Sequence, residues 1–297
     1  MQKPNAKITA LIEAAKTIIF GKDHELKLAL TAILSRGHLL LEDIPGVGKT
    51  TFVMCLAQLL GLRMNRIQFT SDLLPADILG THIYDPKKSE FQFYPGPIFA
   101  EIVLGDELNR ASPKSQSAFL QAMEEKQVTI DGKSYDLPEL FFIIATQNPQ
   151  TQVGTSALPE SQLDRFMMKF ALGFPDRNSE LKILSQGNPR DKLESLKPLF
   201  TADELMNLQK SAMAVSVSEP LLEYIQDLLS LSRSVGSGLS PRAGLQLLQA
   251  AKAWTYIHGR DFVLPDDVQA MARPVLNHRL GSDSMGVDNL LKSVVVK

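Results

Sequence analysis

The sequence has a single cysteine, no long apolar run and no excess of charge of either sign, and each absence excludes a class of protein. Because Cys55 stands alone, it can form neither an intramolecular disulfide nor a multi-cysteine metal site, and on its apolar stretch we expect a packed, inert thiol. No stretch approaches the roughly 18 apolar residues of a membrane span. Residues 1–21 have no continuous apolar core of the signal-peptide type. We therefore expect a cytoplasmic protein without membrane insertion.

The balance of charge also argues against nucleic acid as a partner, while leaving room for a local basic groove. The formal net charge is −2 over 297 residues, so the chain has no overall basic field. Hydrophobic residues make up 44% and charged residues 22%, which is ordinary for a globular protein of one large or two smaller domains. The five histidines show no metal-ligand spacing, and the chain has no internal repeat.

Residues 38–52, HLLLEDIPGVGKTTF, combine the parts of a phosphate-binding loop. A short run of buried-strand character leads into a turn with Gly46 and Gly48, and an apolar helix follows. Glycines let consecutive backbone N–H groups turn toward a phosphate, and the helix aims its positive end at the same point. Lys49 would reach the β- and γ-phosphates of ATP, and the Thr50 hydroxyl would ligate Mg²⁺.

This loop departs from the strict pattern G-x-x-x-x-G-K-[ST] at one position, because Asp43 stands where the first glycine is expected. The alternative is an ordinary strand-to-helix loop that contains glycines by chance. The strand before it and the helix after it favour the phosphate loop. The expected nucleotide-binding residues of the loop are Pro45, Gly46, Val47, Gly48, Lys49, Thr50 and Thr51.

Two acidic residues and one amide follow apolar strands further along the chain. Residues 98–104 lead into Asp106 and Glu107, and residues 140–145 lead into Asn148. Beside a phosphate loop, Asp106 would hold Mg²⁺ through water and Glu107 would polarise the attacking water. The Asn148 amide could position that water; by itself, an Asn before proline fits an ordinary turn equally well.

Strands and helices alternate up to about residue 175, which predicts an α/β domain with a parallel sheet. The expected strands are residues 38–41, 66–70, 98–104, 140–145 and 167–172. From Asp176 onward no strand-like run precedes the short valine tail, and helical patterns dominate. We predict a nucleotide-binding domain over residues 1–175 and an all-α lid domain over residues 176–297.

Two further segments are candidates for hairpins. Residues 128–135 have an Asp131-Gly132 turn between short strands, which is typical of a β-hairpin. Residues 71–98 are irregular and contain Phe91, Phe93 and Tyr94. They could form an exposed hairpin that contacts a partner, but we favour aromatic side chains folded beneath a loop.

Several longer blocks together resemble the MoxR group of AAA+ ATPases. The similarity runs from Gly21 to about Leu280, and its blocks are LEDIPGVGKT, FTSDLLPADILG, DELNRASPKSQSAFLQAMEE, IATQNP, LPESQLDRF and SPRAGLQLLQAAKAW. The resemblance implies a P-loop AAA+ core, a five-stranded parallel sheet sandwiched by helices, followed by the all-α lid. The family tolerates a residue other than glycine at position 43.

The resemblance also assigns roles to individual residues. The implied assignments are residues 46–51 as the Walker A loop, Asp106 and Glu107 as the Walker B pair, Asn148 as sensor I, Arg165 as the arginine finger for the adjacent subunit, and Arg242 as sensor II on the lid. Phe20 and Gly21 would lie near the adenine. Arg242, just inside a helix N-terminus, would offer a phosphate both its guanidinium and the helix dipole.

Both arginines have ordinary alternatives. Arg165 could form a salt bridge within its own subunit, to Asp164 or Glu160, and Arg242 could be a solvated residue of a first helical turn. An arginine supplied by a neighbouring subunit contributes roughly 10³–10⁵ in rate to phosphoryl transfer. If Arg165 is such an arginine finger, catalysis would require assembly of the subunits.

The expected function is Mg²⁺-dependent ATP hydrolysis by a ring, a hexamer by resemblance, that remodels or matures a client. The family implies a partner protein with a von Willebrand factor A domain. The alternatives are a nucleotide-gated scaffold with little turnover, a nucleic-acid-associated motor, and a small-molecule kinase. A scaffold would lack one of Glu107, Asn148 or Arg165, and all three are present. Residues 72–93 lack the GAFTGA loop of enhancer-binding activators.

Overall fold

The computed structural model of the chain describes residues 6–149, 158–236, 238–280 and 286–294, and its centre is a five-stranded sheet. Neighbouring strands are all parallel. In spatial order the strands are β2 (Met64–Gln68), β5 (Ile102–Asp106), β8 (Phe142–Gln147), β1 (Leu39–Glu42) and β9 (Met168–Phe170). The predicted parallel sheet is therefore confirmed.

Both faces of this sheet are covered by helices, which explains why its central strands are apolar throughout. On β1, Leu39 and Leu41 belong to the core cluster formed with α1 (Ala6–Lys16), α2 (Asp23–Leu34) and α3 (Lys49–Leu60). Leu40, between them, packs in the cluster on the opposite face. That cluster is formed with α5 (Pro113–Glu125).

The chain after β9 is helical, as predicted. Its helices are α7 (Arg177–Gln186), α8 (Ala202–Met213), α9 (Glu219–Ser234), α10 (Pro241–Ile257), α11 (Pro265–Leu276) and α12 (Val287–Ser293). Within the described ranges beyond β9, the β-pairing is limited to the isolated bridge between Ser216 and Phe262. We propose the domain boundary near residue 175, in the segment that connects β9 to α7.

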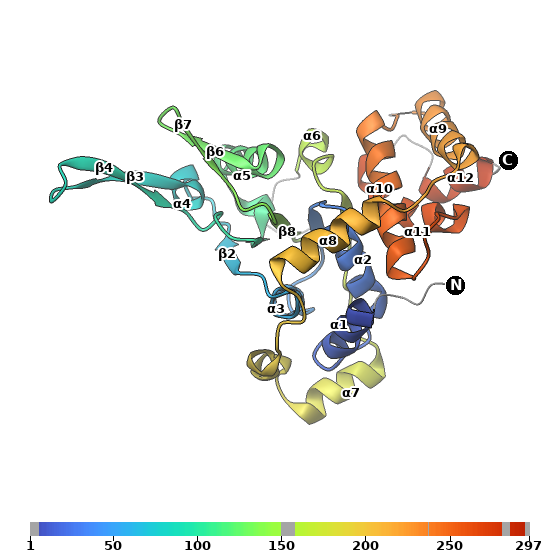
Figure 1. Cartoon of the computed structure of the whole chain (residues 1–297), viewed down its shortest axis with the longest axis horizontal. Helices are drawn as coiled ribbons and strands as arrows, with labels where there is room; N and C mark the ends of the chain where they lie inside the picture. Colours follow the sequence, from blue (N-terminus) through green and yellow to red (C-terminus); the bar gives the residue numbers. More distant parts are fainter. Residues whose placement is uncertain (1–5, 150–157, 237, 281–285, 295–297) are drawn as a thin grey trace.

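The helical domain shares a core with the sheet domain. Figure 1 shows α8 crossing α2, with α10 next to both, and the three helices contact one another. Buried side chains from α2, α8 and α10 belong to the same apolar cluster. The buried amide of Gln209 on α8 donates to the Ile33 carbonyl at the end of α2 (2.8 Å) and accepts from Arg36 Nε (3.1 Å).

Two hairpins extend from the sheet domain. The predicted Asp131-Gly132 turn is confirmed: it joins β6 (Gln127–Ile130) to β7 (Lys133–Asp136), with φ of 50° and 78° at its two residues. After the short helix α4 (Pro75–Leu79), β3 (Gly80–Asp85) and β4 (Glu90–Pro95) form a second hairpin that points away from the molecule (Figure 1).

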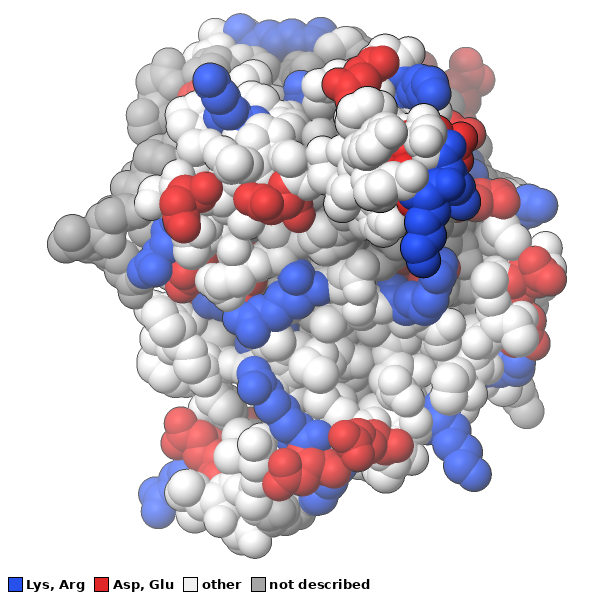
Figure 2. Space-filling view, turned by 90° about the vertical axis from the view of Figure 1, so that its left-hand side faces the viewer, with Lys and Arg blue, Asp and Glu red and all other residues white. Residues whose placement is uncertain are grey.

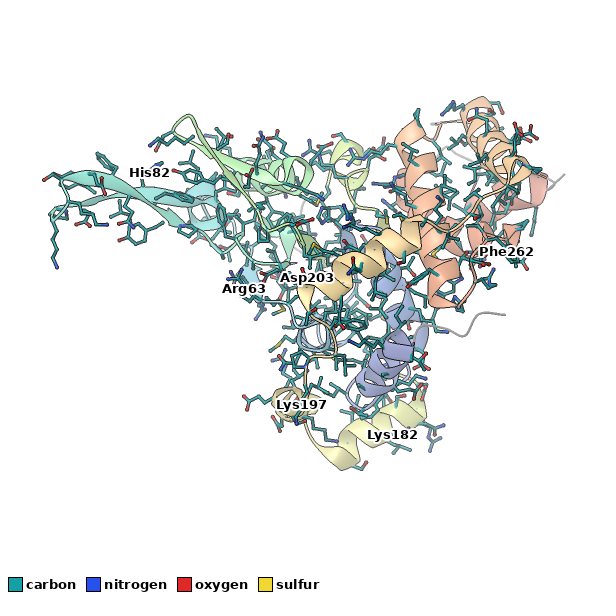
Figure 3. All side chains as sticks on the ribbon, viewed as in Figure 1. Arg63, His82, Lys182, Lys197, Asp203 and Phe262 are labelled. Carbon is teal, nitrogen blue, oxygen red and sulfur yellow. The ribbon has the colours of Figure 1, made fainter. Side chains whose placement is uncertain are left out.

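The interpretation that we favoured for residues 71–98 is therefore wrong, because Phe91 is 70% exposed at the outer part of the β3–β4 hairpin. Support reaches only its base, where Phe93 stacks on Tyr135 of β7 at 3.9 Å. His82 joins the hairpins by contacts to Asp131 (2.8 Å) and to the Tyr135 hydroxyl (3.0 Å), and Figure 3 places it on the β3–β4 hairpin. Beyond that point, among the residues that the structure describes, Tyr84 and Phe91 are both exposed.

The face toward which this hairpin points carries charge of both signs. In Figure 2, viewed from that side, lysine and arginine are interspersed with aspartate and glutamate on a largely neutral surface. This distribution agrees with the near-zero net charge and gives no basic stripe on this face.

Cys55 is fully buried in α3, and burial raises the pKa of its thiol to about 12, as expected for an inert cysteine. Over the described ranges, every helix is too short or too polar to cross a bilayer.

A buried acid holds α11 against α10. Asp267 accepts from Arg260 Nη1 (2.6 Å), Thr255 Oγ1 (2.9 Å) and the Leu264 N–H (2.9 Å). Burial alone would raise the pKa of Asp267, but the hydrogen bonds from Arg260, Leu264 and Thr255 outweigh it and hold that pKa below the ordinary 3.8. Asp267 therefore stabilises the fold while it is ionised.

We expect Asp267→Asn to lower the free energy of unfolding by about 2–4 kcal/mol, because it leaves Arg260 without its counter-charge. Stability from a depressed pKa is present above 3.8 and is lost as the pH falls through the folded value. The difference from wild type should therefore narrow on acidification below that value. Urea unfolding as a function of pH measures this difference in the free energy of unfolding. The control is Asp266→Asn, at the exposed neighbouring position. Equal losses of unfolding free energy in both variants would contradict the stabilising role of Asp267.

Candidate functional site

A cavity of about 420 Å³ lies at the carboxyl ends of β1, β5 and β8. It brings together the loop after β1, the acidic pair after β5 and the amide after β8. The lining residues include Phe20, Pro45, Gly46, Val47, Gly48, Lys49, Thr50, Thr51, Asp106, Glu107 and Asn148. Most of the residues expected to bind nucleotide thus face one space.

The glycines of the loop leave that space open. Gly46 and Gly48 have φ of 89° and 92°, a region that favours glycine. Apart from its chain neighbours, a Cβ atom added to either residue would meet no atom of the described residues within 4 Å, so both glycines border open space. Gly48 immediately precedes α3, whose N-terminus contributes partial positive charge. The loop therefore has the form of a phosphate cradle.

Lys49 is held at the base of this cradle. Its Nζ donates to the carbonyls of Asp43 (2.6 Å) and Ile44 (2.9 Å). Burial lowers the pKa of Lys49, while the negative charges of Asp43, Asp106 and Glu107 act in the opposite direction. A phosphate in the cradle would add a further charge partner for this ammonium group.

Asp43, at the position where the strict motif has glycine, connects the loop to the segment after β9. Its Oδ1 accepts from the Ile44 N–H (2.9 Å) and its Oδ2 accepts from the Gly173 N–H (2.6 Å). Lys22 binds the same segment through the carbonyls of Leu172 and Phe174. The departure from the motif therefore has a structural role, because it links the phosphate loop to the segment after β9.

Asp106 is oriented by its neighbours in the sheet. Its Oδ1 accepts from Thr146 Oγ1 (2.6 Å) on β8, and its Oδ2 accepts from Arg66 Nη2 (2.6 Å) on β2. Asp106 and Thr50 both line the cavity. A carboxylate and a hydroxyl beside a phosphate cradle fit Mg²⁺, which usually takes one or two protein oxygens together with phosphate oxygens and water.

Glu107 has a backbone conformation that is uncommon for a residue other than glycine. Its φ and ψ are 59° and 45°, and such a conformation costs about 1–3 kcal/mol. The Glu107 N–H donates to Thr146 Oγ1 (2.9 Å), which holds it in place. The turn aims the carboxylate at the cavity, where Asn148 Nδ2 donates to Oε1 (3.0 Å) and Gln68 Nε2 donates to Oε2 (3.2 Å).

The sequence analysis missed several residues of this site. Arg66 and Gln68 lie on β2, Thr146 lies on β8, and Arg190 follows α7 and donates from Nε to Thr51 Oγ1 (3.2 Å). A polar residue at the carboxyl end of an apolar strand was a usable signal for Thr146. The contact of Arg190 depends on the path of the chain after α7, for which the sequence carries no signal.

Of the residues expected near the adenine, Phe20 lines the cavity and Gly21 does not. A Cβ atom on Gly21 would approach Ser179 Oγ to 2.6 Å, so this glycine packs closely against the start of α7. Lys182 lies over the Phe20 ring at 5.9 Å, and Figure 3 shows it on α7. Ile183 of the same helix lines the cavity. Phe20 and α7 thus form its apolar side.

Arg165 and Arg242 lie outside the cavity of their own subunit. Both contact Glu124 near the end of α5, Arg165 at 3.3 Å and Arg242 at 2.9 Å. Asp164, which the sequence offered as an ion-pair partner for Arg165, forms an ion pair with Arg279 instead (2.8 Å). The structure therefore brings the two arginines together, and separates them from the phosphate loop of the same chain.

Comparison with known proteins gives the following similarities. The model for the ATPase family associated with various cellular activities (AAA) matches residues 38–168, and an AAA lid domain matches residues 231–290. YeaC, an uncharacterized protein of Bacillus subtilis, is 45% identical over 91% of this chain and 85% of its own length. Chaperone MoxR1 of Mycobacterium tuberculosis is 38% identical over 89% of this chain and 73% of its own. A crystal structure described as a candidate ATPase from Cytophaga hutchinsonii has a TM-score of 0.89 at 35% identity, and the match covers 98% of this chain and 95% of that one.

We expect Asp43→Ala to lower the free energy of unfolding by about 2–3 kcal/mol, because it leaves the N–H groups of Ile44 and Gly173 without their acceptor. Asp43→Asn keeps one carbonyl oxygen and should lose less. Urea denaturation measures both variants. If Asp43→Ala were as stable as wild type, the link between the loop and the segment after β9 would have no energetic role.

Proposed function

Because this chain belongs to the MoxR family of AAA+ ATPases, we propose that it hydrolyses ATP in a ring of identical subunits and thereby remodels or matures a client protein. The observation that carries the proposal is the convergence of Lys49, Glu107 and Asn148 on one cavity at the end of the sheet. A phosphate cradle beside a hydrogen-bonded acid and amide suits attack by water on a phosphoanhydride.

In this proposal the loop binds the phosphates of ATP. Backbone N–H groups of residues 46–51 and the N-terminus of α3 bind the β-phosphate, and Lys49 extends to the γ-phosphate. Phe20 and Ile183 contact the adenine from the apolar side of the cavity. Thr50 and Asp106 would hold Mg²⁺, which supplies positive charge that offsets the charge developing on the phosphates.

Glu107 acts as the base toward water in the same proposal. Its carboxylate accepts hydrogen bonds from Asn148 and Gln68, so two amides fix its direction at the edge of the cavity. The Asn148 amide also lies where it can orient the attacking water. Arg110 Nη1 also lies 3.2 Å from Oε2, and a carboxylate directed at the cavity in this way can accept a proton from that water.

Arg165 and Arg242 complete the site of the adjacent subunit. Both lie away from their own cavity and present a shared cationic group at the surface, which supports a role in trans for both. Arg190, bonded to Thr51 beside the loop, supplies a cation within the same subunit. A single subunit therefore has a binding site for ATP but lacks the charges for fast hydrolysis.

The family further leads us to propose a cytoplasmic hexamer with a partner that has a von Willebrand factor A domain. The β3–β4 hairpin is a surface to which this partner or a client could bind, because Phe91 and Tyr84 are exposed on it at 70% and 48%. A nucleic-acid motor is disfavoured by the net charge and by the mixed charges of the face in Figure 2.

We expect ATP turnover per subunit to rise with protein concentration, since each site needs the arginines of a neighbour. Glu107→Gln should bind ATP as tightly as wild type and hydrolyse it about 10²–10⁴-fold more slowly. Arg165→Ala should lose about 10³-fold or more in turnover with little change in ATP affinity. Steady-state turnover and equilibrium binding, with sizing in ATP and Mg²⁺, measure these quantities.

Arg273→Ala is the matched control, because Arg273 forms an exposed ion pair with Asp288 away from the cavity and from Glu124. It should turn over ATP like wild type. Turnover that is independent of concentration and insensitive to Arg165→Ala would mean that the subunit works alone, and the proposed ring with shared sites would be wrong.

A further inference from the structure

Glu124 uses its two carboxylate oxygens to hold two different arginines. Its Oε2 lies 3.3 Å from Arg165 Nε, and its Oε1 accepts from Arg242 Nη1 at 2.9 Å. Glu124 is on the last turn of α5, Arg165 precedes β9, and Arg242 is in the first turn of α10. One carboxylate therefore connects the sheet domain to the lid at the point where both arginines reach the surface.

The backbone around Arg165 is fixed from the other side by a buried arginine of the lid. Arg279 Nε donates to Asp164 Oδ1 (2.8 Å), and its Nη2 donates to the carbonyls of Asp164 (3.1 Å) and Phe166 (2.6 Å). The side chain of Arg279 is only 3% exposed. The main chain of Arg165 is thus held by Arg279, whereas the direction of the Arg165 guanidinium is set by Glu124.

Glu124 lies beside more positively charged side chains than its single carboxylate can neutralise. A cavity of about 160 Å³ beside it is lined by Arg36, Lys126, Arg165 and Arg242 together with this one carboxylate. Two guanidinium groups that share an acceptor repel each other, and the carboxylate between them offsets that repulsion. The cluster retains an excess of positive charge, which suits a multiply charged anion such as a phosphate chain.

The contacts with Glu124 also leave donors for such an anion. The ion pair of Arg165 with Glu124 is made through Nε at 3.3 Å, and a guanidinium carries four further N–H groups on its terminal nitrogens. Arg242 contacts Glu124 through Nη1 and lies 4.0 Å from Asp164 Oδ2 through Nε. Each arginine can keep its bond to Glu124 while its remaining N–H groups meet phosphate oxygens.

We propose that Glu124 is a positioning residue that aligns Arg165 and Arg242 as one cationic pair for the phosphates of ATP bound by the adjacent subunit. This inference rests on the proposed function, in which both arginines act in trans. Glu124 does not touch the nucleotide of its own subunit, because it does not line that cavity. Its effect is therefore on the rate of hydrolysis and not on the affinity for ATP.

The test compares Glu124→Ala and Glu124→Gln with Glu125→Ala, which removes the same charge from the neighbouring position of the same helix. Glu124→Ala should lower kcat about 10- to 100-fold, because small displacements of charged groups at a reacting centre have effects of that size. Glu124→Gln keeps one acceptor and should be intermediate. KM for ATP should stay within about two-fold, and the thermal unfolding curves should overlap, since exposed ion pairs contribute little to stability.

A combined variant distinguishes positioning from a general effect on the fold. If Glu124 acts through the arginines, Glu124→Ala should cost almost nothing more in a background that carries both Arg165→Ala and Arg242→Ala. Independent, multiplicative losses would overturn the proposal. An increase of kcat in Glu124→Ala would also overturn it, because the contact would then restrain the arginines and not align them.

Mixed assemblies separate this proposal from the proposed function. Glu107→Gln subunits bind ATP without hydrolysing it but carry intact arginines, so mixing them with Arg165→Ala subunits should restore turnover. Failure of that mixture would overturn the trans site itself. If it succeeds, mixing Glu107→Gln with Glu124→Ala subunits should restore turnover as well. Recovery in the first mixture and not in the second would place the role of Glu124 within its own subunit and overturn only the present inference.

Discussion

The site depends on one constraint, which is that all five strands of the sheet run in the same direction. The segments that follow β1, β5 and β8 must then leave the sheet at one edge, and three distant parts of the sequence meet there. Hydrogen bonds between neighbouring strands then fix the orientation of the side chains that meet there. Thr146 binds both the carboxylate of Asp106 and the N–H of Glu107, so a single hydroxyl on β8 orients the acidic pair on β5.

The features that depend on local sequence were predictable. The glycines and Lys49 of the phosphate loop and the Asp131-Gly132 turn each follow from residues close together in the chain, and the structure has the loop and the turn at those positions. The parallel sheet was predictable because strands separated by helices have few other solutions. Parallel pairing then brought Glu107 within hydrogen-bond distance of Asn148 without further information.

The features that depend on distant residues were not predictable. Arg66 and Gln68 reach the acidic pair only because β2 pairs with β5 in one register, which no local pattern in β2 specifies. The location of Arg242 beside Arg165 depends on how α10 packs across the sheet domain. The hairpin at residues 80–95 was misjudged because aromatic residues are usually buried, and its support ends at the contact between Phe93 and Tyr135.

The apolar cluster that α2 shares with α8 and α10 has a consequence for the synthesis of the chain. The sheet domain leaves the ribosome first, and until residues 202–257 have followed, the side of α2 that they cover remains in water. A nascent chain that paused near residue 175 would expose this apolar surface, which favours aggregation or binding by chaperones. Burial of this side of α2 therefore depends on the synthesis of residues 202–257.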